Sequence, residues 1–477
     1  MSYCGYVTRI KNLHKHSNAD RLLVGECFGN NVIVSTDYTE GQLGVYFPVD
    51  GRLSKEFCEA NDLVRRKDEN GNNCGGYLDP EKRNITAIRL RGEKSDGLFL
   101  PIGCLESFTD IKQLKDGDVI TVLNGVEICR KYIPNSNSRR KGAGGGSSRA
   151  AKKNFAPTFY EHVETEQLAY HLNELKAGDV IELTLKMHGS SQRTGYLPLV
   201  HTKRTWLDKL LHRHGKDYTE YGYVTGTRRV VLDNEHHGGY YEDNSFRIAM
   251  ADKFKGKLRK GETVYYEVVG FQGKGGAPIM PSVSNKKISD REFTRKYGDM
   301  TVFSYGCDPD GGYDDNVIIR QDEIEDGYVD VFAEPCCNIY VYRMTMVNED
   351  GDTVEYSPDQ MRHRCDQIGV HYVPVMERFI IPETEDTPDE DGFYKEINAG
   401  EYVLKKAEEY YDGADPVGRT HIREGVVIRV VSSPEIRVYK HKNFSFKVLE
   451  GIAKDVATAP DIEEAQEEGV SECQECL

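Results

Sequence analysis

One break in composition constrains the fold of this chain more than any other feature. From Ser136 to Lys153 the sequence reads SNSRRKGAGGGSSRAAKK, which is rich in Gly and Ser and carries six basic residues but no acidic one. Such a segment buries too little apolar surface to offset the entropy lost on ordering it. We therefore predict a flexible linker over residues 136–155, which separates one domain at 1–135 from another at 156–454.

The two blocks differ in their hydrophobic pattern. The first contains short alternating stretches bounded by Gly, Asn and Pro, at 22–27, 31–36, 43–47, 86–90, 97–100 and 118–123. This spacing predicts a small all-β barrel or sandwich. The second block mixes strand-like runs with helical ones such as 165–175 and lacks regular βαβ alternation, which favours an α+β fold. Two similar segments, Leu114–Ile120 and Leu175–Ile181, each predict a Gly-Asp turn that leads into a strand.

The acidic net charge at first disfavours a nucleic-acid partner, and the hydropathy of the chain argues against a membrane protein. The 477 residues carry a net charge of −16 and contain no apolar run of membrane-spanning length. The start of the sequence has no apolar secretory signal, and twelve scattered cysteines suit reduced thiols, so we expect a cytoplasmic protein with no membrane partner.

Half of that net charge comes from the last 23 residues of the sequence. Residues 455–477 contain eight acidic residues and no basic one, which predicts a solvated acidic tail. The tail also holds Cys473 and Cys476 in a CxxC pattern, but no second pair is placed to complete a zinc site. Phosphates respond to charge within a Debye length of about 10 Å, so basic surface elsewhere in the chain keeps a nucleic-acid partner possible.

The second Gly-Asp turn precedes the segment most suggestive of chemistry. Alternation along residues 180–186 puts Glu182, Thr184 and Lys186 on one face of a strand. Lys186 begins the pattern Lys186-Met-His188-Gly189, in which a glycine would let the backbone approach a ligand. A deprotonated lysine amine is a nucleophile that attacks phosphorus. The bare Lys-x-x-Gly pattern is weak evidence, because it recurs at 94–97 and 253–256.

Five later segments strengthen the interpretation of Lys186. A glycine turn delivers Arg228 and Arg229 into an apolar strand, and Glu267 lies in another strand. An aromatic strand, a Glu-Gly-Val-Val segment and a pair of lysines follow, and they contain Tyr340 and Tyr342, Glu424, and Lys440 and Lys442. Nucleotidyl transfer needs these parts: a nucleophile, an aromatic surface for a base, carboxylates for ribose and metal, and cations for phosphates.

This ordered set resembles motifs I, III, IIIa, IV and V of the covalent nucleotidyltransferases, the superfamily of polynucleotide ligases and mRNA capping enzymes. His188 and the serine hydroxyls after it resemble the corresponding motif in RNA-repair ligases of the T4 RNA ligase 2 kind. The resemblance covers about residues 186–447 and implies an ATP-grasp-like domain built on antiparallel β-sheet.

The resemblance also implies residue roles. Lys186 would accept AMP from ATP, with His188 and Gly189 in the ATP-binding segment. Glu267 would face the ribose, Tyr342 would stack on adenine, and Glu424 would bind Mg²⁺ or Mn²⁺. Lys440 and Lys442 would contact the α-phosphate, and Lys447 is a rival for one of them. Arg228 matches the arginine after motif I, with Arg229 and Arg204 as alternatives.

Segments near the start of the chain resemble an OB-fold of the tRNA-binding type. They are Ile10–Leu22 and Leu90–Leu98, and the second contains the Lys94-Ser-Asp-Gly97 pattern. An OB barrel offers a curved face for nucleic acid. An N-terminal OB domain before the Lys-x-x-Gly domain is similar to the Deinococcus and Naegleria type of RNA ligase.

The sequence therefore predicts a monomeric ATP-dependent RNA ligase that acts on nicked or broken RNA, including hybrid duplexes. Two alternatives stay open: an mRNA-capping-type guanylyltransferase that uses GTP, and a non-catalytic RNA-binding protein.

Overall fold

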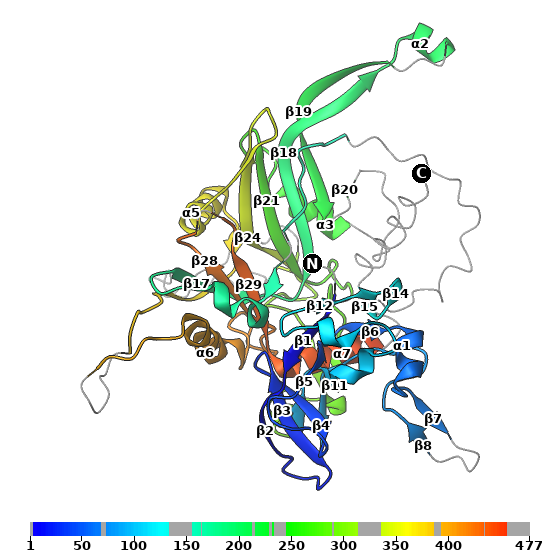
Figure 1. Cartoon of the computed structure of the whole chain (residues 1–477). Coiled ribbons are helices and arrows are strands. Elements are labelled where there is room, and N and C mark those ends of the chain that lie inside the picture. The colour runs from blue at the N-terminus through cyan, green and yellow to red at the C-terminus, as the bar shows by residue number, and fades with distance from the viewer. Residues whose placement is uncertain are drawn as a thin grey trace, which may run out of the picture.

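The computed structural model describes residues 3–67, 73–132, 155–163, 165–211, 215–228, 231–232, 245–288, 291–312, 335–385, 393–433 and 435–455. The predicted linker, apart from residue 155, and the predicted tail, apart from residue 455, lie outside these ranges. The chain has the mixed α+β fold that the sequence predicts (Figure 1). No helix in the described part of the chain is long and apolar enough to cross a membrane.

Antiparallel strands dominate the first block. A four-stranded sheet has the order β11 (Leu98–Pro101), β5 (Leu43–Phe47), β1 (Gly5–Arg9), β12 (Val119–Ile120). A three-stranded sheet contains β2 (Lys11–Lys15), β3 (Leu22–Cys27) and β4 (Asn30–Ser35). The shorter elements are β6 (Gly51–Leu53) paired with β15 (Cys129–Lys131), β7 (Arg65–Lys67) with β8 (Asn73–Gly75), β9 (Ile88–Leu90) with β10 (Glu93–Ser95), β13 (Val122–Leu123) with β14 (Val126–Glu127), and helix α1 (Lys55–Ala60).

Two larger sheets form the second part of the chain. The first has the order β16 (Glu166–Gln167), β29 (Val438–Lys442), β28 (Gly425–Val430), β17 (Val180–Lys186), β27 (Val375–Ile380). The second has the order β20 (Val231–Leu232), β19 (Lys216–Thr227), β18 (Ser190–Lys203), β21 (Glu262–Gly270), β24 (Cys337–Val347), β25 (Thr353–Glu355), with β26 (His371–Tyr372) also paired to β24. A small ladder joins β22 (Val283–Ser284) to β23 (Met300–Thr301).

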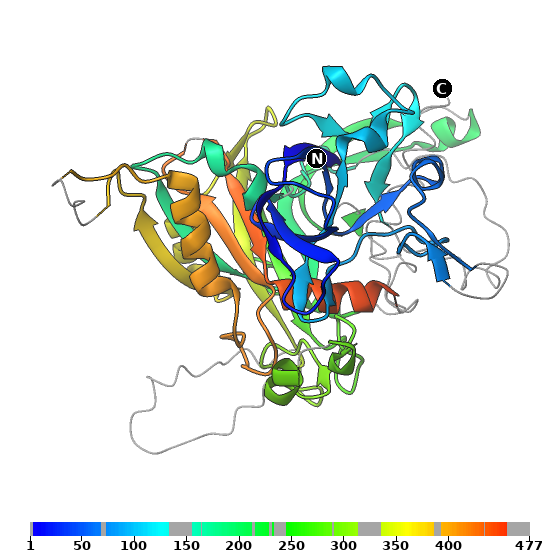
Figure 2. The same ribbon diagram turned by 60° about the horizontal axis from the view of Figure 1, so that its bottom comes forward.

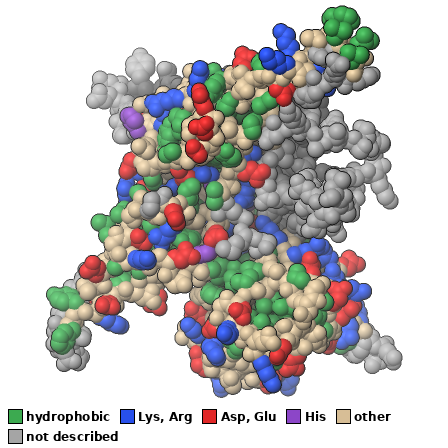
Figure 3. Space-filling view, turned by 45° about the horizontal axis from the view of Figure 1, so that its top comes forward, with side chains coloured by type: hydrophobic (Ala, Val, Ile, Leu, Met, Phe, Trp, Pro, Cys, Tyr) green, Lys and Arg blue, Asp and Glu red, His purple; other side chains and the backbone are tan. Residues whose placement is uncertain are grey.

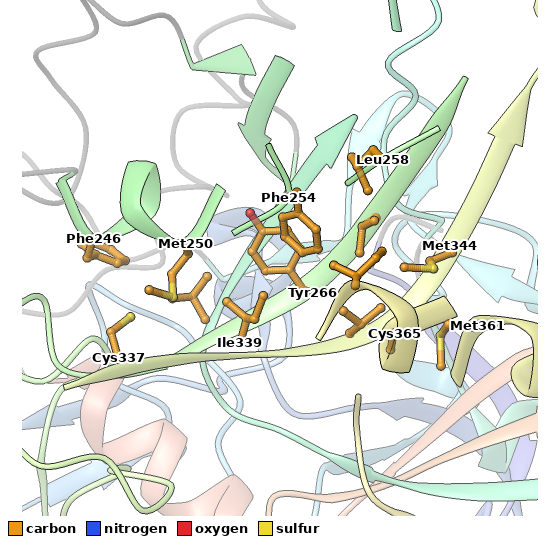
Figure 4. Packing of buried hydrophobic residues seen from close by; sticks show 14 of the residues in the cluster. Phe246, Met250, Phe254, Leu258, Tyr266, Cys337, Ile339, Met344, Met361 and Cys365 are labelled. Carbon is orange, nitrogen blue, oxygen red and sulfur yellow. The ribbon is translucent and has the colours of Figure 1, made fainter. Parts of the chain in front are cut away.

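The helices of this part pack on the sheets, except for α2, which lies exposed at the end of β18. They are α2 (Trp206–Leu210), α3 (Ser245–Asp252), α4 (Arg291–Tyr297), α5 (Pro358–Ile368), α6 (Ala399–Tyr411) and α7 (Phe444–Asp455). Ser357 and Gln360 form a capping box at the start of α5, and Gly369 ends the helix with a φ of 77°. Figure 4 shows α3 and α5 residues such as Phe246 and Cys365 packing against Tyr266 and Ile339 of the seven-stranded sheet.

Both predicted Gly-Asp turns are present and have the same construction. Gly117 and Gly178 have positive φ angles of 98° and 86°, which glycine adopts without strain. Asp118 accepts a hydrogen bond from the backbone N–H three residues earlier at 2.7 Å, and Asp179 does the same at 3.1 Å. The repeated sequence thus encodes a repeated local turn.

The helix expected over 165–175 is wrong. The structure has strand β16 there, followed by two short 3-10 turns at Leu168–Tyr170 and Leu172–Glu174. Strand β16 completes the five-stranded sheet by pairing in parallel with β29, and Leu168 and Leu175 are buried beneath it. Tertiary pairing thus overrides the local helical pattern.

The first block lies against helix α7, as Figure 2 shows. Lys447 of α7 forms an ion pair with Asp96, and both side chains are nearly buried. Lys94 lies over the ring of Phe444 at 5.3 Å, and Tyr6 stacks on Tyr170 at 4.4 Å between ring centroids. The first block therefore packs directly against the second part of the chain.

Candidate active site

Three neighbouring strands bring the key residues of the candidate site together. The antiparallel register places Lys186, the last residue of β17, opposite Gly425, the first residue of β28. Gly425 lies opposite Lys442, the last residue of β29. Glu424 directly precedes Gly425, so the two lysines and this carboxylate meet at one edge of the five-stranded sheet. Gly425 has a φ of 152°, and a Cβ there would lie 2.1 Å from the carbonyl oxygen of His441.

Glu424 joins both lysines in a buried ionic cluster. Its Oε1 lies 2.7 Å from the Nζ of Lys186 and 3.2 Å from the Nζ of Lys442. The Glu424 side chain is only 2% exposed. Burial alone would raise the pKa of Glu424, but the two ammonium groups hold that pKa below its ordinary value. Glu424 is therefore a carboxylate at neutral pH.

Lys442 makes a second ion pair, with Glu450 of α7 at 2.9 Å. Burial opposes its charged form, but Glu450, Glu424 and Asp50 together raise the pKa of Lys442 above the ordinary lysine value. Asp50 belongs to the first block and also lines the cavity around the cluster. Lys442 is therefore a permanent cation. The sequence did not indicate Glu450 or Asp50, because neither belongs to a recognisable motif.

His188 lies beside the same carboxylate in an aromatic setting. Its ring makes edge contacts with Phe303 and Phe446 at 4.7 and 4.8 Å between centroids. Its Nδ1 is 3.7 Å from Oε2 of Glu424, which is longer than a hydrogen bond. Burial lowers the pKa of His188 to about 4, so the imidazole is neutral at pH 7. Its backbone N–H donates to the hydroxyl of Tyr305 at 2.6 Å.

The seven-stranded sheet forms the opposite wall. Ser191 pairs with Glu267 across β18 and β21, and Glu267 pairs with Tyr340 across β21 and β24. The β21–β24 register shifts at this point, so that Tyr342 is an extra residue in a β-bulge. The Tyr342 hydroxyl lies 3.0 Å from the Ser191 hydroxyl, and the ring is 4.9 Å from that of His162. The bulge thus directs Tyr342 towards the cavity.

Position 189 requires glycine because of a neighbouring strand, whereas the sequence suggested close approach of a ligand. A Cβ at Gly189 would lie 2.4 Å from the carbonyl oxygen of Val268 and 2.8 Å from the Cγ of Glu267. The close approach of strand β21 therefore demands glycine here, whether or not a ligand is nearby.

A cavity of about 850 Å³ contains this arrangement. The sequence-predicted residues that line it are Lys186, His188, Gly189, Arg228, Glu267, Tyr342, Glu424, Lys440, Lys442 and Lys447. Arg204 does not join them: it is exposed just beyond the end of β18. Arg229 lies outside the described residues. Lys447 pairs with Asp96 of the first block, whereas Lys442 pairs with Glu424 and Glu450.

The lining of the cavity also includes ion pairs that the motifs did not indicate. Arg362 donates to both carboxylate oxygens of Glu182, each at 2.9 Å. Glu355 bridges Arg343 at 2.8 Å and Arg429 at 2.6 Å. The alternation of β17 did predict that Glu182 shares a face with Lys186, but its arginine partner comes from a helix distant in sequence.

The donor set fits one divalent cation held together with a polyphosphate. The Oε2 atom of Glu424 is buried and has no hydrogen-bond partner. Among the residues described, no three carboxylate, His or Cys groups gather as a preformed metal site. Mg²⁺ commonly binds through one or two carboxylates, substrate phosphates and water, so a single free carboxylate oxygen suits it.

Comparison with solved structures identifies the class of fold. No protein-family model and no curated protein matches the chain. A substituted form of Naegleria gruberi RNA ligase with AMP and Mn matches it with a TM-score of 0.51 and 13% identity, over 93% of this chain and 97% of that one. Two other substituted forms with ATP and Mn match with TM-scores of 0.51 and 14% identity, over 93% and 94% of this chain and 98% and 99% of theirs.

The chain therefore has the fold of an RNA ligase. The particular likeness is to the Naegleria gruberi enzyme over nearly the full length of both chains, which confirms the resemblance that the motifs indicated.

Proposed function

We propose that this protein is an ATP-dependent RNA ligase that joins a 3′-hydroxyl to a 5′-phosphate. The observation that carries the proposal is the contact of Lys186, Glu424 and Lys442 within one cavity, opposite Glu267 and Tyr342. A half-buried lysine beside a carboxylate and a permanent cation suits attack on a phosphate. The likeness to an RNA ligase structure adds support for the same chemistry.

In the first step, the Nζ of Lys186 attacks the α-phosphorus of ATP. An N–P bond forms, the bond from the α-phosphorus to the bridging oxygen breaks, and pyrophosphate leaves with that electron pair. Lys186 must lose a proton before it attacks, and Glu424 at 2.7 Å is an acceptor within hydrogen-bond distance. Lys440 and Lys442 stabilise the negative charge that grows on the phosphate oxygens.

The walls of the cavity suit a bound nucleotide. Tyr342 offers a ring for adenine, since the bulge in β24 directs it inward, and Glu267 is placed to bind the ribose hydroxyls. Arg228 lines the same cavity, and its fork of donors suits phosphate oxygens. A bound Mg²⁺ or Mn²⁺ would offset phosphate charge, with the free Oε2 of Glu424 as a ligand.

Two further steps complete the joining reaction. The 5′-phosphate of an RNA end attacks the lysyl-AMP phosphorus, which breaks the N–P bond and restores the Lys186 amine. The 3′-hydroxyl then attacks the activated 5′-phosphate, a phosphodiester forms, and AMP leaves. Both displacements reuse the same cations around the phosphate, so one site suffices for all three steps.

We also propose that residues 1–135 form an OB-type nucleic-acid-binding domain and that residues 156–454 form the nucleotidyltransferase domain. Antiparallel sheets in the first block and its contact with α7 beside the cavity support this division. Nicked or broken RNA is the proposed substrate, including hybrid duplexes, for a monomer in the cytoplasm.

The test is transfer of label from [α-³²P]ATP to the protein in the presence of Mg²⁺ or Mn²⁺. We expect an acid-labile adduct in the wild type and none in Lys186→Ala. The matched control is Lys255→Ala, whose side chain is 61% exposed and pairs with Asp252 away from the cavity. An adduct that persists in Lys186→Ala, or none in the wild type, would refute the assignment.

The same assay separates the two alternatives. Labelling from GTP but not from ATP would identify a guanylyltransferase. RNA binding without adduct formation or end joining would identify a non-catalytic RNA-binding protein.

A further inference from the structure

A long β-hairpin projects from the body of the molecule beyond the candidate site (Figure 1). Strands β18 and β19 form it and stay paired from Gln192 with Thr227 to Lys203 with Lys216. Strand β18 begins only four residues after Lys186. At about 3.4 Å per residue, the stretch from Ser191 to Lys203 spans roughly 40 Å, so the hairpin is an arm rigidly connected to the site.

One face of the arm changes character along its length. Leu197 and Leu199 on this face are buried in a small core. By strand alternation, His201 and Lys203 continue the same face, but both are exposed. His201 stacks on Tyr218 of the partner strand, with ring centroids 5.4 Å apart. The outer arm thus presents polar and aromatic groups where its inner part packs a core.

The next cross-strand pair on this face has an unfavourable composition. Lys203 lies directly opposite Lys216, and like charges in that arrangement destabilise a sheet. Exposed Arg204 follows Lys203 in the chain. Within the described part of the protein, none of these three cations has an ion-pair partner. Three unpaired cations at the end of a strand pair are suited to an anionic ligand.

The arm ends in the short helix α2, which carries exposed apolar residues. Trp206 is 72% exposed and Leu210 is 67% exposed, and Leu207 and Leu211 are also exposed. Figure 3 shows hydrophobic side chains with Lys and Arg nearby at this end of the molecule. Trp206 is the one tryptophan in the chain. Exposed apolar residues of this size, beside cations, mark a binding surface rather than ordinary protein surface.

We propose that the end of this arm binds double-stranded RNA that flanks the ends to be joined. Lys203, Arg204 and Lys216 contact phosphates, while Trp206 and the leucines enter the wide, shallow minor groove. The inference rests on the proposed ligase function for the identity of the nucleic acid. A duplex is the occupant that fits, because it is stiff enough to extend from the cavity to a point some 40 Å along the arm.

Charge and aromatic pairing favour RNA over a lipid surface. Facing lysines beside a stacked His-Tyr pair are the interleaving of cations and rings that nucleic-acid-binding surfaces use. The membrane becomes an outcome of the test, which uses the fluorescence of Trp206 in the full-length protein. We expect saturating blunt RNA duplex of about 24 base pairs to quench this emission, since double-stranded RNA modules span about 16 base pairs.

The second measurement is affinity for the same duplex as a function of salt. The double variant Lys203→Glu/Lys216→Glu should bind at least about tenfold more weakly, and its log–log salt slope should fall by about 2. Lys286→Glu is the control, because Lys286 is 68% exposed and pairs with Asp299 far from the arm. Equal affinities for the double variant and the wild type would overturn the proposal.

Two further outcomes are decisive. If the duplex leaves the emission of Trp206 unchanged, but vesicles containing anionic phospholipid shift it to the blue, then the arm binds a membrane surface and the RNA proposal is wrong. Formation of the Lys186 adduct needs no RNA, so the arm variants should label with ATP as the wild type does. If the wild type forms no adduct, the proposed ligase function is wrong. If the arm variants label normally and bind the duplex as the wild type does, only the proposed RNA-binding role of the arm is wrong.

Discussion

Removal of the charge on Glu424 is the most informative perturbation of this protein. In Glu424→Gln the ammonium groups of Lys186 and Lys442 keep their positions but lose the carboxylate at 2.7 and 3.2 Å. Glu450 still pairs with Lys442, so Lys186 loses the partner that neutralises it. Breaking one side of a buried ion pair costs about 3–5 kcal/mol, and the lower end of this range applies because the Lys186 side chain is 22% exposed.

That free energy converts into a measurable change in thermal stability. For domains of roughly this size, 1 kcal/mol corresponds to about 2–4 °C, so a loss of about 3 kcal/mol should lower the Tm of Glu424→Gln by roughly 6–12 °C. The assay is thermal unfolding followed by circular dichroism, together with labelling by ATP, which we expect to be lost. Glu409→Gln is the control: its 46% exposed carboxylate pairs with Lys406 on the surface and should change Tm by less than about 2 °C.

A double variant tests the reasoning more strictly. Lys186→Met removes the stranded cation, so Lys186→Met/Glu424→Gln should be more stable than Glu424→Gln alone. A Tm loss in Glu424→Gln no greater than that of Glu409→Gln would refute the buried cluster. So would strictly additive effects of the two substitutions.

Three other predictions follow from single contacts. Tyr342→Ala should raise the KM for ATP by about 5–150-fold through lost stacking, while Tyr342→Phe, which loses only the contact with Ser191, should change it far less; equal effects would contradict the stacking role. Burial raises the pKa of Asp415 to about 7, so the folded state binds a proton that the unfolded state releases, and stability falls as pH rises from about 4 to 7; Asp415→Asn should therefore raise Tm at pH 8 and lose that advantage near pH 4. Asp96→Asn and Lys447→Met should each lower Tm, with a coupling of about 0.5–3 kcal/mol in a double-mutant cycle, and additive losses would show that the first block and α7 are not joined through this pair.

Much of the fold could be predicted because local patterns and tertiary structure agree. The alternating stretches of the first block correspond closely to strands β3, β4, β5 and β11. The two Gly-Asp turns form as predicted, because a glycine with positive φ and the aspartate directly after it satisfy the turn locally. The helix at 165–175 failed because strand β16 gains its stability from pairing with β29, some 270 residues later.

Much of the candidate site could also be predicted, because several of its residues lie at strand ends. Lys186, Glu424 and Lys442 each terminate or precede a strand that the pattern identifies, and antiparallel neighbours bring those ends together. Arg204 was a reasonable alternative to Arg228 by residue type, but the length of β18 carries it out along the arm. The sequence separation from Lys186 could not show which of the two arginines lines the cavity.

The sequence by itself determined the chemical groups and their order: a lysine, carboxylates, an aromatic strand and further cations, each in a segment whose local pattern predicts a strand. Only the tertiary structure decided which groups meet. The pairing of β17, β28 and β29 placed Glu424 between two lysines, the bulge in β24 turned Tyr342 inward, and α7 brought Glu450 to Lys442. The physical reason is that alternation fixes the face of a side chain within a strand, whereas register, bulges and packing against distant segments fix its neighbours.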